Sequence, residues 1–313
     1  TIDPGDYVDD DADTYDLATL QEYAQIIDWS LLDSSLDDLM TRLFGQMTLD
    51  HLRLDLNEIA LLRAVVKYGA AITHIVRMAT VIRERMDGKT FDLEVSVDET
   101  GTTTSHVEHF VIVNELKRLN VDFVSIAPRF VGRFEKGVDY IGSLDELDSD
   151  IAGHAAIMRH FRSTYKLSLH TGSDKFGVYP IAMKHTGGLV HLKTAGTSYL
   201  EALRVMAIVE PGLFRQVLDF ARERYEEDRK TYHVSATLDK VVSSADLSDE
   251  QLPDLLNQFD ARQVLHVTYG SVLNTYGDGL AKMLKTHESA YHRGLQHHFD
   301  RHLEAFKVGT HAK

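Results

Sequence analysis

From about residue 91 onward, short apolar segments alternate with amphipathic helical patterns, and this alternation restricts the fold more than any other feature. Strands separated by helices usually pair in parallel, and the helices then pack outside the sheet. The sequence predicts strands at residues 93–99, 122–129, 167–170, 189–193, 233–236 and 264–268. It also predicts helical structure between residues 17 and 86 and a last helix over about residues 280–306.

The predicted strands have one apolar face and one polar face. Val95 and Val97 share one face, whereas Ser96 and Asp98 share the other, and the later strands alternate in the same way. An open doubly wound sheet is buried on both faces and would read as a continuous apolar run. In a barrel, apolar side chains face the helices and polar ones converge on the mouth. The pattern therefore predicts an α/β fold, a (β/α) TIM-type barrel whose first strand or strands precede Thr1 or lie in the opening segment.

The chain is expected to contain an acidic, helical segment at residues 1–90, either part of the barrel or a helical insertion, and a catalytic barrel domain at residues 91–313. A net charge of −15 argues against nucleic-acid and membrane partners, because both require basic surfaces. No apolar run approaches the roughly 20 residues that span a bilayer. We expect a cytoplasmic protein with a small-molecule substrate, and a homo-oligomer is compatible with the sequence.

Polar residues that can do chemistry follow the predicted strands at their carboxyl ends. They are Asp98, Glu99, Arg129, His170, Asp174, Lys175, His191, Lys193, His233 and His266. The chain has no cysteine, so that imidazole and carboxylate groups are its only strong metal ligands, and these suit Zn, Mn, Co, Ni or Fe. Lys193 shares a strand face with His191, and it would form a salt bridge with a carboxylate or act directly on the substrate. A Gly-x-Gly-x-x-Gly fingerprint is missing, which disfavours chemistry through NAD.

Several long blocks of the sequence are similar to one known family. They are Glu-Val-Ser-Val-Asp-Glu-Thr at 94–100, the block at 127–142, Lys-Leu-Ser-Leu-His-Thr-Gly-Ser-Asp-Lys-Phe at 166–176, His-Leu-Lys-Thr-Ala-Gly-Thr-Ser at 191–198, and shorter blocks at 262–267 and 300–303. Through these blocks, the chain resembles the tagaturonate epimerases, which interconvert the keto-hexuronates tagaturonate and fructuronate.

The resemblance implies inversion of a carbinol carbon that lies β to the ketone. The C–H bond of that carbon is not acidified, so retro-aldol cleavage and recombination is the expected route. The resemblance implies a divalent metal, zinc first and Mn, Co, Ni or Fe as alternatives, held by His170, His191 and His266, with His233 as a spare ligand. Asp98 and Glu99 are the expected acid–base pair, and Lys193 is a further catalytic residue. The expected substrate ligands are Arg129, Lys136, Ser173, Asp174 and Lys175.

Four alternatives remain open at this point. The chain could be a metal-dependent aldolase or isomerase of another keto sugar, or a Schiff-base enzyme with Lys193 or Lys166 as nucleophile. It could also be a non-catalytic barrel that binds sugar acids. Finally, it could be a truncated subunit that needs a partner to complete its site.

Overall fold

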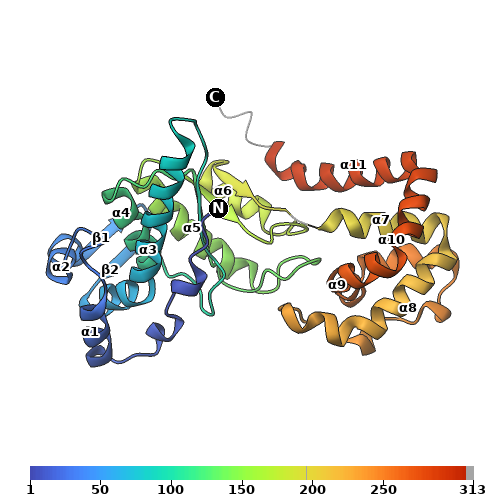
Figure 1. Ribbon diagram of the computed structural model, residues 1–313, viewed down its shortest axis with the longest axis horizontal. Coiled ribbons are helices and arrows are strands. Elements are labelled where there is room, and N and C mark those ends of the chain that lie inside the picture. The colour runs from blue at the N-terminus through green and yellow to red at the C-terminus, as the bar shows by residue number, and fades with distance from the viewer. Residues whose placement is uncertain (195, 308–313) are drawn as a thin grey trace. The chain divides into compact units, whose positions relative to one another are not determined.

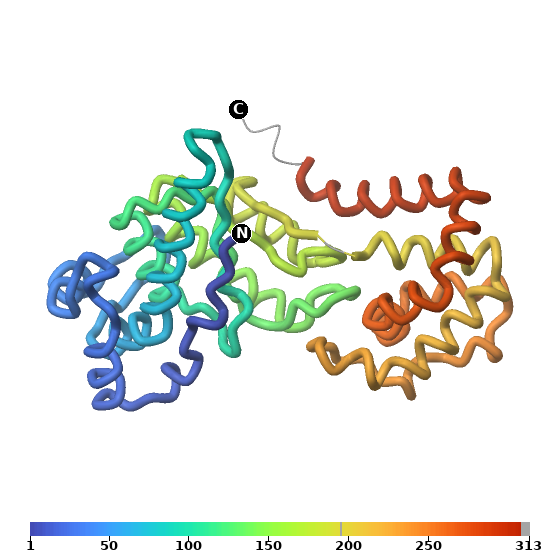
Figure 2. The backbone as a smooth tube through the Cα atoms, viewed as in Figure 1, coloured from blue at the N-terminus to red at the C-terminus, as the bar shows by residue number. Residues whose placement is uncertain are grey.

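The computed structural model describes residues 1–194 and 196–307 (Figure 1). The chain divides into two compact units and passes between them several times. Unit 1 comprises Thr1–Val131, Ser143–Leu169 and Ile181–His191, and unit 2 comprises Gly132–Gly142, His170–Pro180 and Leu192–Lys313. Residues 1–90 therefore lie in unit 1, whereas residues 91–313 contribute to both units. Figure 2 traces the backbone from the blue and green segments of unit 1 to the orange and red helices of unit 2.

Unit 1 is built around a parallel sheet. Its elements are α1 (Leu17–Ile26), α2 (Leu36–Leu43), β1 (Gly45–Leu49), β2 (Leu52–Leu56), α3 (Glu58–Met86), β3 (Glu94–Val97), α4 (His106–Arg118), β4 (Ser125–Pro128), α5 (Leu144–His160) and β5 (Lys166–Leu169); α6 (Tyr179–Thr186) and β6 (Val190–Leu192) extend across its boundary. The four-stranded sheet has the order β3-β4-β5-β6. Pairing of β3 with β4 and of β4 with β5 is parallel, and Ile2 adds a parallel bridge to Val95.

In unit 1, the side chain of the residue just before a helix caps its first turn and marks where the helix begins. Ser105 and Glu108 form a capping box at the start of α4, in which each side chain binds the backbone N–H of the other residue. The Asn57 side chain accepts a hydrogen bond from the Ala60 N–H and so caps α3. The capping residues fix the positions at which the chain turns from the end of the sheet into a helix.

The core of unit 1 lies between the apolar face of the sheet and its covering helices. Val95, Ile126 and Leu167 from three strands are buried together with Ile72 of α3 and Ile112 of α4. Full burial of such side chains contributes about 1.5–3 kcal/mol each. Helix α3 is long and apolar enough to cross a membrane by length and composition, since an 18-residue window reaches a mean hydropathy of 1.5. Of that window, 61% is buried inside the protein, as is usual for a core helix.

Unit 2 is mainly helical. It contains α7 (Thr197–Val209), α8 (Pro211–Asp228), η3 (Arg229–Thr231), η4 (Leu238–Lys240), η5 (Ser244–Asp246), η6 (Asp249–Asn257), α9 (Phe259–Val267), α10 (Tyr269–Thr286) and α11 (Glu288–Glu304). Leu203, Phe214, Leu218 and Leu265 are fully buried in one core that joins α7, α8 and α9. The predicted last helix is thus the end of α10 followed by α11, with a break at His287.

The four predicted strands between residues 93 and 193 are confirmed, but the last two are wrong. Residues 233–236 form no strand, and residues 264–268 are helical, since α9 ends at Val267. Ala261, Val264, Leu265 and Thr268 are buried at helical spacing, and a short apolar run cannot distinguish a strand from a buried helix. The TIM-type barrel is not confirmed, because within the described residues the parallel sheet has four strands and is not closed.

The prediction of continuous helix before residue 86 also missed a hairpin. Strands β1 and β2 pair antiparallel, with Leu49 opposite Leu52 across a tight turn. Asp50 in this turn has a φ of 52°, a left-handed conformation that aspartate tolerates better than most residues. Leu52, Leu54 and Leu56 alternate with polar residues, and this period of two was the available signal.

Candidate functional site

The polar face of the parallel sheet carries a chain of hydrogen bonds that joins all four strands. Glu94 of β3 accepts hydrogen bonds from Ser125 of β4 (2.8 Å) and from Thr1 (3.0 Å). His191 of β6 places its Nδ1 2.5 Å from the Glu94 carboxylate and 3.1 Å from the Ser168 hydroxyl of β5. The alternation predicted from the sequence therefore produces a polar surface that is organised around one carboxylate.

The Glu94–His191 pair fixes the imidazole orientation. An ionised carboxylate can only accept hydrogen bonds, so Nδ1 of His191 carries the proton and donates to Glu94. The Nε2 atom then bears a lone pair. Such a carboxylate–histidine pair is the usual outer support of a metal-ligating histidine, because it sets both the tautomer and the ring orientation. Side-chain exposure is 44% for His191 and 7% for Glu94, so the imidazole is accessible and its support is buried.

The carboxyl ends of β3 and β4 present the next two groups. Asp98 is half-buried and accepts a hydrogen bond of 2.6 Å from Ser96, on the same face of β3. Arg129 follows β4 directly and is half-buried. Its backbone is fixed by two hydrogen bonds with Thr104 in the loop after β3. Unit 1 thus has a carboxylate and a guanidinium just after β3 and β4, and an imidazole on the polar face of β6.

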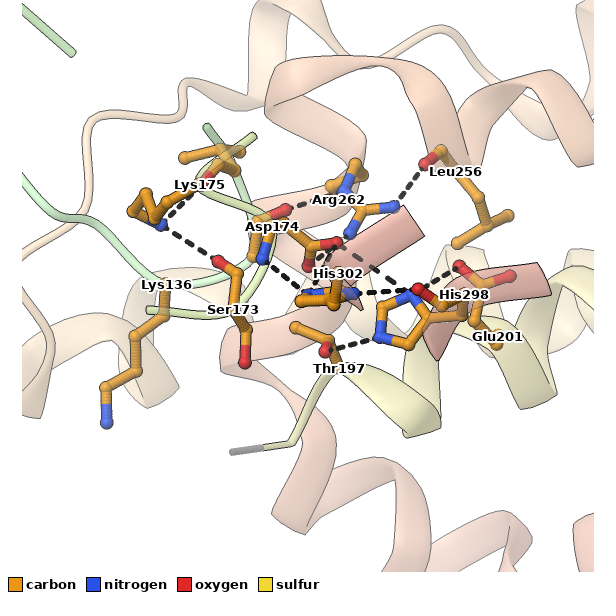
Figure 3. Close-up of polar contacts among 12 residues, drawn as sticks. Lys136, Ser173, Asp174, Lys175, Thr197, Glu201, Leu256, Arg262, His298 and His302 are labelled. Carbon is orange, nitrogen blue, oxygen red and sulfur yellow. Dashed lines mark hydrogen bonds and ion pairs between the residues drawn. The ribbon is translucent and has the colours of Figure 1, made fainter. Parts of the chain in front are cut away.

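Unit 2 contains a second polar cluster, which is buried. Asp174 forms an ion pair of 3.0 Å with Arg262 of α9, and its backbone N–H donates to Nε2 of His302 (Figure 3). His302 Nδ1 donates to the carbonyl of His298, and His298 Nε2 lies 3.0 Å from the Thr197 hydroxyl. Burial lowers the pKa of His298 and of Arg262. The potential ligand atoms of Asp174, His298 and His302 lie close enough together to hold a metal ion. Both nitrogens of His302, however, already form hydrogen bonds within the protein.

Lys175 is buried next to this cluster. Its ammonium donates to the carbonyls of Glu135 (2.8 Å), Val138 (2.5 Å) and Ser173 (3.2 Å). Burial lowers the pKa of Lys175 to about 8. Thr171 and Asp174 in the same turn have left-handed φ values of 48° and 60°, which cost energy in non-glycine residues. The ammonium and the Asp174 contacts together hold the turn in this conformation.

Comparison with known proteins identifies the family. The sequence profile described as tagaturonate epimerase matches residues 1–306 of this chain. The chain belongs to the tagaturonate epimerase family. A curated relative, the tagaturonate/fructuronate epimerase of Thermotoga maritima, is 40% identical over 306 residues, which cover 97% of this chain and 62% of the relative.

Solved structures of the family share the fold. The glycerol-complexed crystal structure of the fructuronate–tagaturonate epimerase from Cohnella laeviribosi has a TM-score of 0.91 at 34% identity and covers 98% of this chain and 63% of that one. The native crystal structure of the same enzyme gives a TM-score of 0.89, also at 34% identity and with the same coverage. The chain therefore spans somewhat less than two thirds of the length of the relatives that it matches.

The three histidines predicted as metal ligands for this tagaturonate epimerase family member occupy different local structures. His170 is the turn residue directly after β5, and His191 lies in β6. His266 lies in α9 instead of at a strand end, so the strand predicted there is corrected. Burial lowers the pKa of His266 to about 4, which keeps the imidazole neutral. Its Nδ1 is buried and has no hydrogen-bond partner in the part of the chain that the structure describes. Their assignment as ligands remains a prediction.

The remaining predicted site residues differ in their exposure to solvent. Glu99, Lys136 and Lys193 are exposed. Figure 3 shows the Lys136 ammonium directed away from the buried cluster, and this group lies over the Tyr232 ring. Ser173 is buried, as are its neighbours Asp174 and Lys175. His233 lies in an irregular segment.

Several site residues were missed from the sequence, although most had a signal. Glu94 lies on the same strand face as Ser96 and Asp98, so the period of two could have identified it. His298 and His302 are four residues apart, a spacing that places both on one helix face. Arg262 had no comparable signal, because its partner lies 88 positions away in the sequence.

Proposed function

We propose that this chain forms the epimerase site of its family and inverts one carbinol centre of a keto-hexuronate, interconverting tagaturonate and fructuronate. The observation that carries the proposal is the Glu94–His191 pair on the polar face of the sheet, with Asp98 and Arg129 at the carboxyl ends of β3 and β4. Membership of the family supports the substrate class.

The proposed reaction is a retro-aldol cleavage followed by aldol recombination. The carbon–carbon bond between the carbinol and the carbon next to the ketone breaks, giving an aldehyde and an enediolate. After the aldehyde presents its other face, the same bond forms again and the configuration is inverted. No oxidant or reductant is required. A bound divalent metal would supply Lewis-acid stabilisation of the enediolate oxygens.

The residues of this chain have separate roles in the proposal. Asp98 removes the carbinol proton as the bond breaks and returns it to the alkoxide after recombination, with Glu99 as the second acid–base candidate. Arg129 binds the substrate carboxylate through its planar fork. His191 would hold the metal, which fits its oriented Nε2. His170 and His266 stay the further ligands expected from the sequence. Lys193 contributes positive charge.

The test is an assay of the purified protein with tagaturonate, in which fructuronate is measured directly. Uronates should react and the corresponding neutral keto sugars should react poorly, because these lack the carboxylate. Treatment with a chelator should abolish the reaction, and addition of Zn, Mn, Co or Ni should restore it. Full activity in protein shown to be metal-free by elemental analysis would contradict the metal assignment.

A covalent mechanism gives a different result in the same assay. If a lysine formed a Schiff base, borohydride added with substrate would leave a stable adduct on the protein. We expect an unchanged protein mass, because both candidate nucleophiles, Lys193 and Lys166, are exposed. An adduct mapped to either lysine would replace the metal mechanism by a Schiff-base aldol mechanism.

A further inference from the structure

Unit 1 contains a histidine cluster that the proposed reaction does not use. His106 is the first residue of α4, and Asp150 and His154 lie one turn apart on α5. Their three potential ligand atoms lie within 4.8 Å of one another. Nε2 of His106 is 3.4 Å from Oδ1 of Asp150, and Nε2 of His154 is 3.5 Å from the same oxygen.

His154 is the second, independent observation. Its side chain is fully buried, and its Nε2 has no hydrogen-bond partner among residues 1–194 and 196–307. An unsatisfied buried polar atom normally costs about 1–3 kcal/mol and therefore requires an explanation. Burial lowers the pKa of His154 well below its ordinary value, so that the imidazole is neutral, the form in which it can ligate a metal.

The neighbours of His154 show why hydrogen bonding does not satisfy it. The Nδ1 atoms of His109 and His154 are 2.8 Å apart, and His109 Nε2 is 3.1 Å from the Tyr165 hydroxyl. One of the two Nδ1 atoms must carry a proton and donate it in a hydrogen bond to the other. If His154 donates, its Nε2 lone pair faces the Asp150 carboxylate, which is repulsive unless a cation lies between them. If His109 donates, the Nε2–H of His154 has only an acceptor at a poor distance.

We propose that His106, Asp150 and His154 form a structural zinc-type metal site, separate from the site proposed for epimerisation. Zinc bound at about 2.0–2.2 Å in tetrahedral geometry separates neighbouring ligand atoms by roughly 3.3–3.5 Å, which agrees with the two distances to Asp150. Two imidazoles and one carboxylate are a ligand set that zinc favours, with water in the fourth position.

The surroundings of the three residues support them as ligands. Oδ2 of Asp150 accepts a hydrogen bond of 3.0 Å from the Val131 N–H, which leaves Oδ1 directed to the histidines. His109 orients His154 from the other side, as outer-sphere partners of metal ligands usually do. A side chain at Gly153 would bring its Cβ into collision with Nε2 of His106, so glycine allows the imidazole to approach α5.

One competing contact must be exchanged when metal binds. Nε2 of His106 lies 3.0 Å from the backbone carbonyl of Asp150 and donates to it. Metal binding would exchange this hydrogen bond for a bond between Nε2 and the ion. The bound ion would join the first turn of α4 to α5.

The experiment measures zinc in purified, chelator-treated protein after equilibration with zinc chloride and removal of the excess. We expect the wild type to retain about one equivalent more than His106→Asn or Asp150→Asn, by elemental analysis. His185→Asn is the matched control, because His185 is in the same unit and faces the single carboxylate of Asp148. It should bind as much zinc as the wild type.

A second measurement does not depend on stoichiometry. Zinc should raise the thermal unfolding midpoint of wild type and His185→Asn by several degrees, but should raise that of His106→Asn and Asp150→Asn less. Equal zinc content and equal midpoint shifts in all four proteins would overturn the proposal. Because neither readout is activity, it can fail while the epimerase proposal stands, and the reverse also holds.

Discussion

The polar face of the sheet in unit 1 and the buried cluster of unit 2 use the same residue types in opposite ways. His191 is oriented by Glu94 through one nitrogen, while its other nitrogen bears a lone pair and its side chain is 44% exposed. His302 uses both nitrogens within the protein and is buried. The contrast indicates that engagement of every polar atom marks a structural cluster, whereas support on one side marks a group available for a ligand.

The largest expected effect is on the stability of unit 2. Arg262→Met leaves Asp174 buried without its cation, and loss of one partner from a buried ion pair costs about 3–5 kcal/mol. The measurement is the free energy of unfolding in urea. Arg229→Met is the matched control, since Arg229 is a more exposed arginine of unit 2 whose carboxylate partner is 3.7 Å away, and it should change little. Equal free energies of unfolding for the two variants would show that the buried cluster of unit 2 does not stabilise the fold.

The next effect concerns substrate binding at the sheet. Arg129→Lys replaces a planar fork with a single ammonium, so we expect a loss of about 1.5–3 kcal/mol that appears mainly as a higher KM for uronates. Stability should change far less than in Arg262→Met. An unchanged KM would show that another group holds the substrate carboxylate.

A smaller effect is expected when the support of His191 is altered. Glu94→Gln keeps the size of the side chain but removes its charge, so Nδ1–H of His191 is held less firmly. Outer-sphere substitutions of this kind typically cost about 10–100-fold in metal affinity or activity. Excess zinc should restore part of the activity if the defect is in metal affinity. Activity equal to wild type without added metal would contradict the assigned role of the Glu94–His191 pair.

The smallest expected effect is on the pH dependence of stability. Burial lowers the pKa of His298, so the unfolded chain takes up a proton at this residue before the folded protein does. Stability should therefore fall as the pH drops below about 6.5, the ordinary histidine value, until the folded pKa is passed. His298→Gln should make this decline shallower, because the difference in bound protons between the unfolded and folded states falls by up to about one. His292→Gln, at an exposed position of the same helix, should not. Parallel curves for all three proteins would refute this assignment.

Much of unit 1 follows from periodicity in the sequence. The four parallel strands were predictable because Val95, Leu167 and their neighbours alternate with polar residues, and the pleat turns a period of two into two faces. The same rule placed Asp98 and His191 on the polar face. Unit 2 was less predictable, because its helix α9 has an apolar run that reads equally well as a strand.

The sequence by itself determined where the four strands of the parallel sheet lie and which of their faces is polar, and it supplied candidates for acid, base and ligand. Only the tertiary structure decided that the sheet is open in the described residues, that Glu94 supports His191, and that the turn containing Asp174 is held by Arg262 and His302. The physical reason is range. The alternation of apolar and polar residues shows which face of a strand is buried. Hydrogen-bond partners that are 88 to 128 positions apart in the sequence come together only when the whole unit packs.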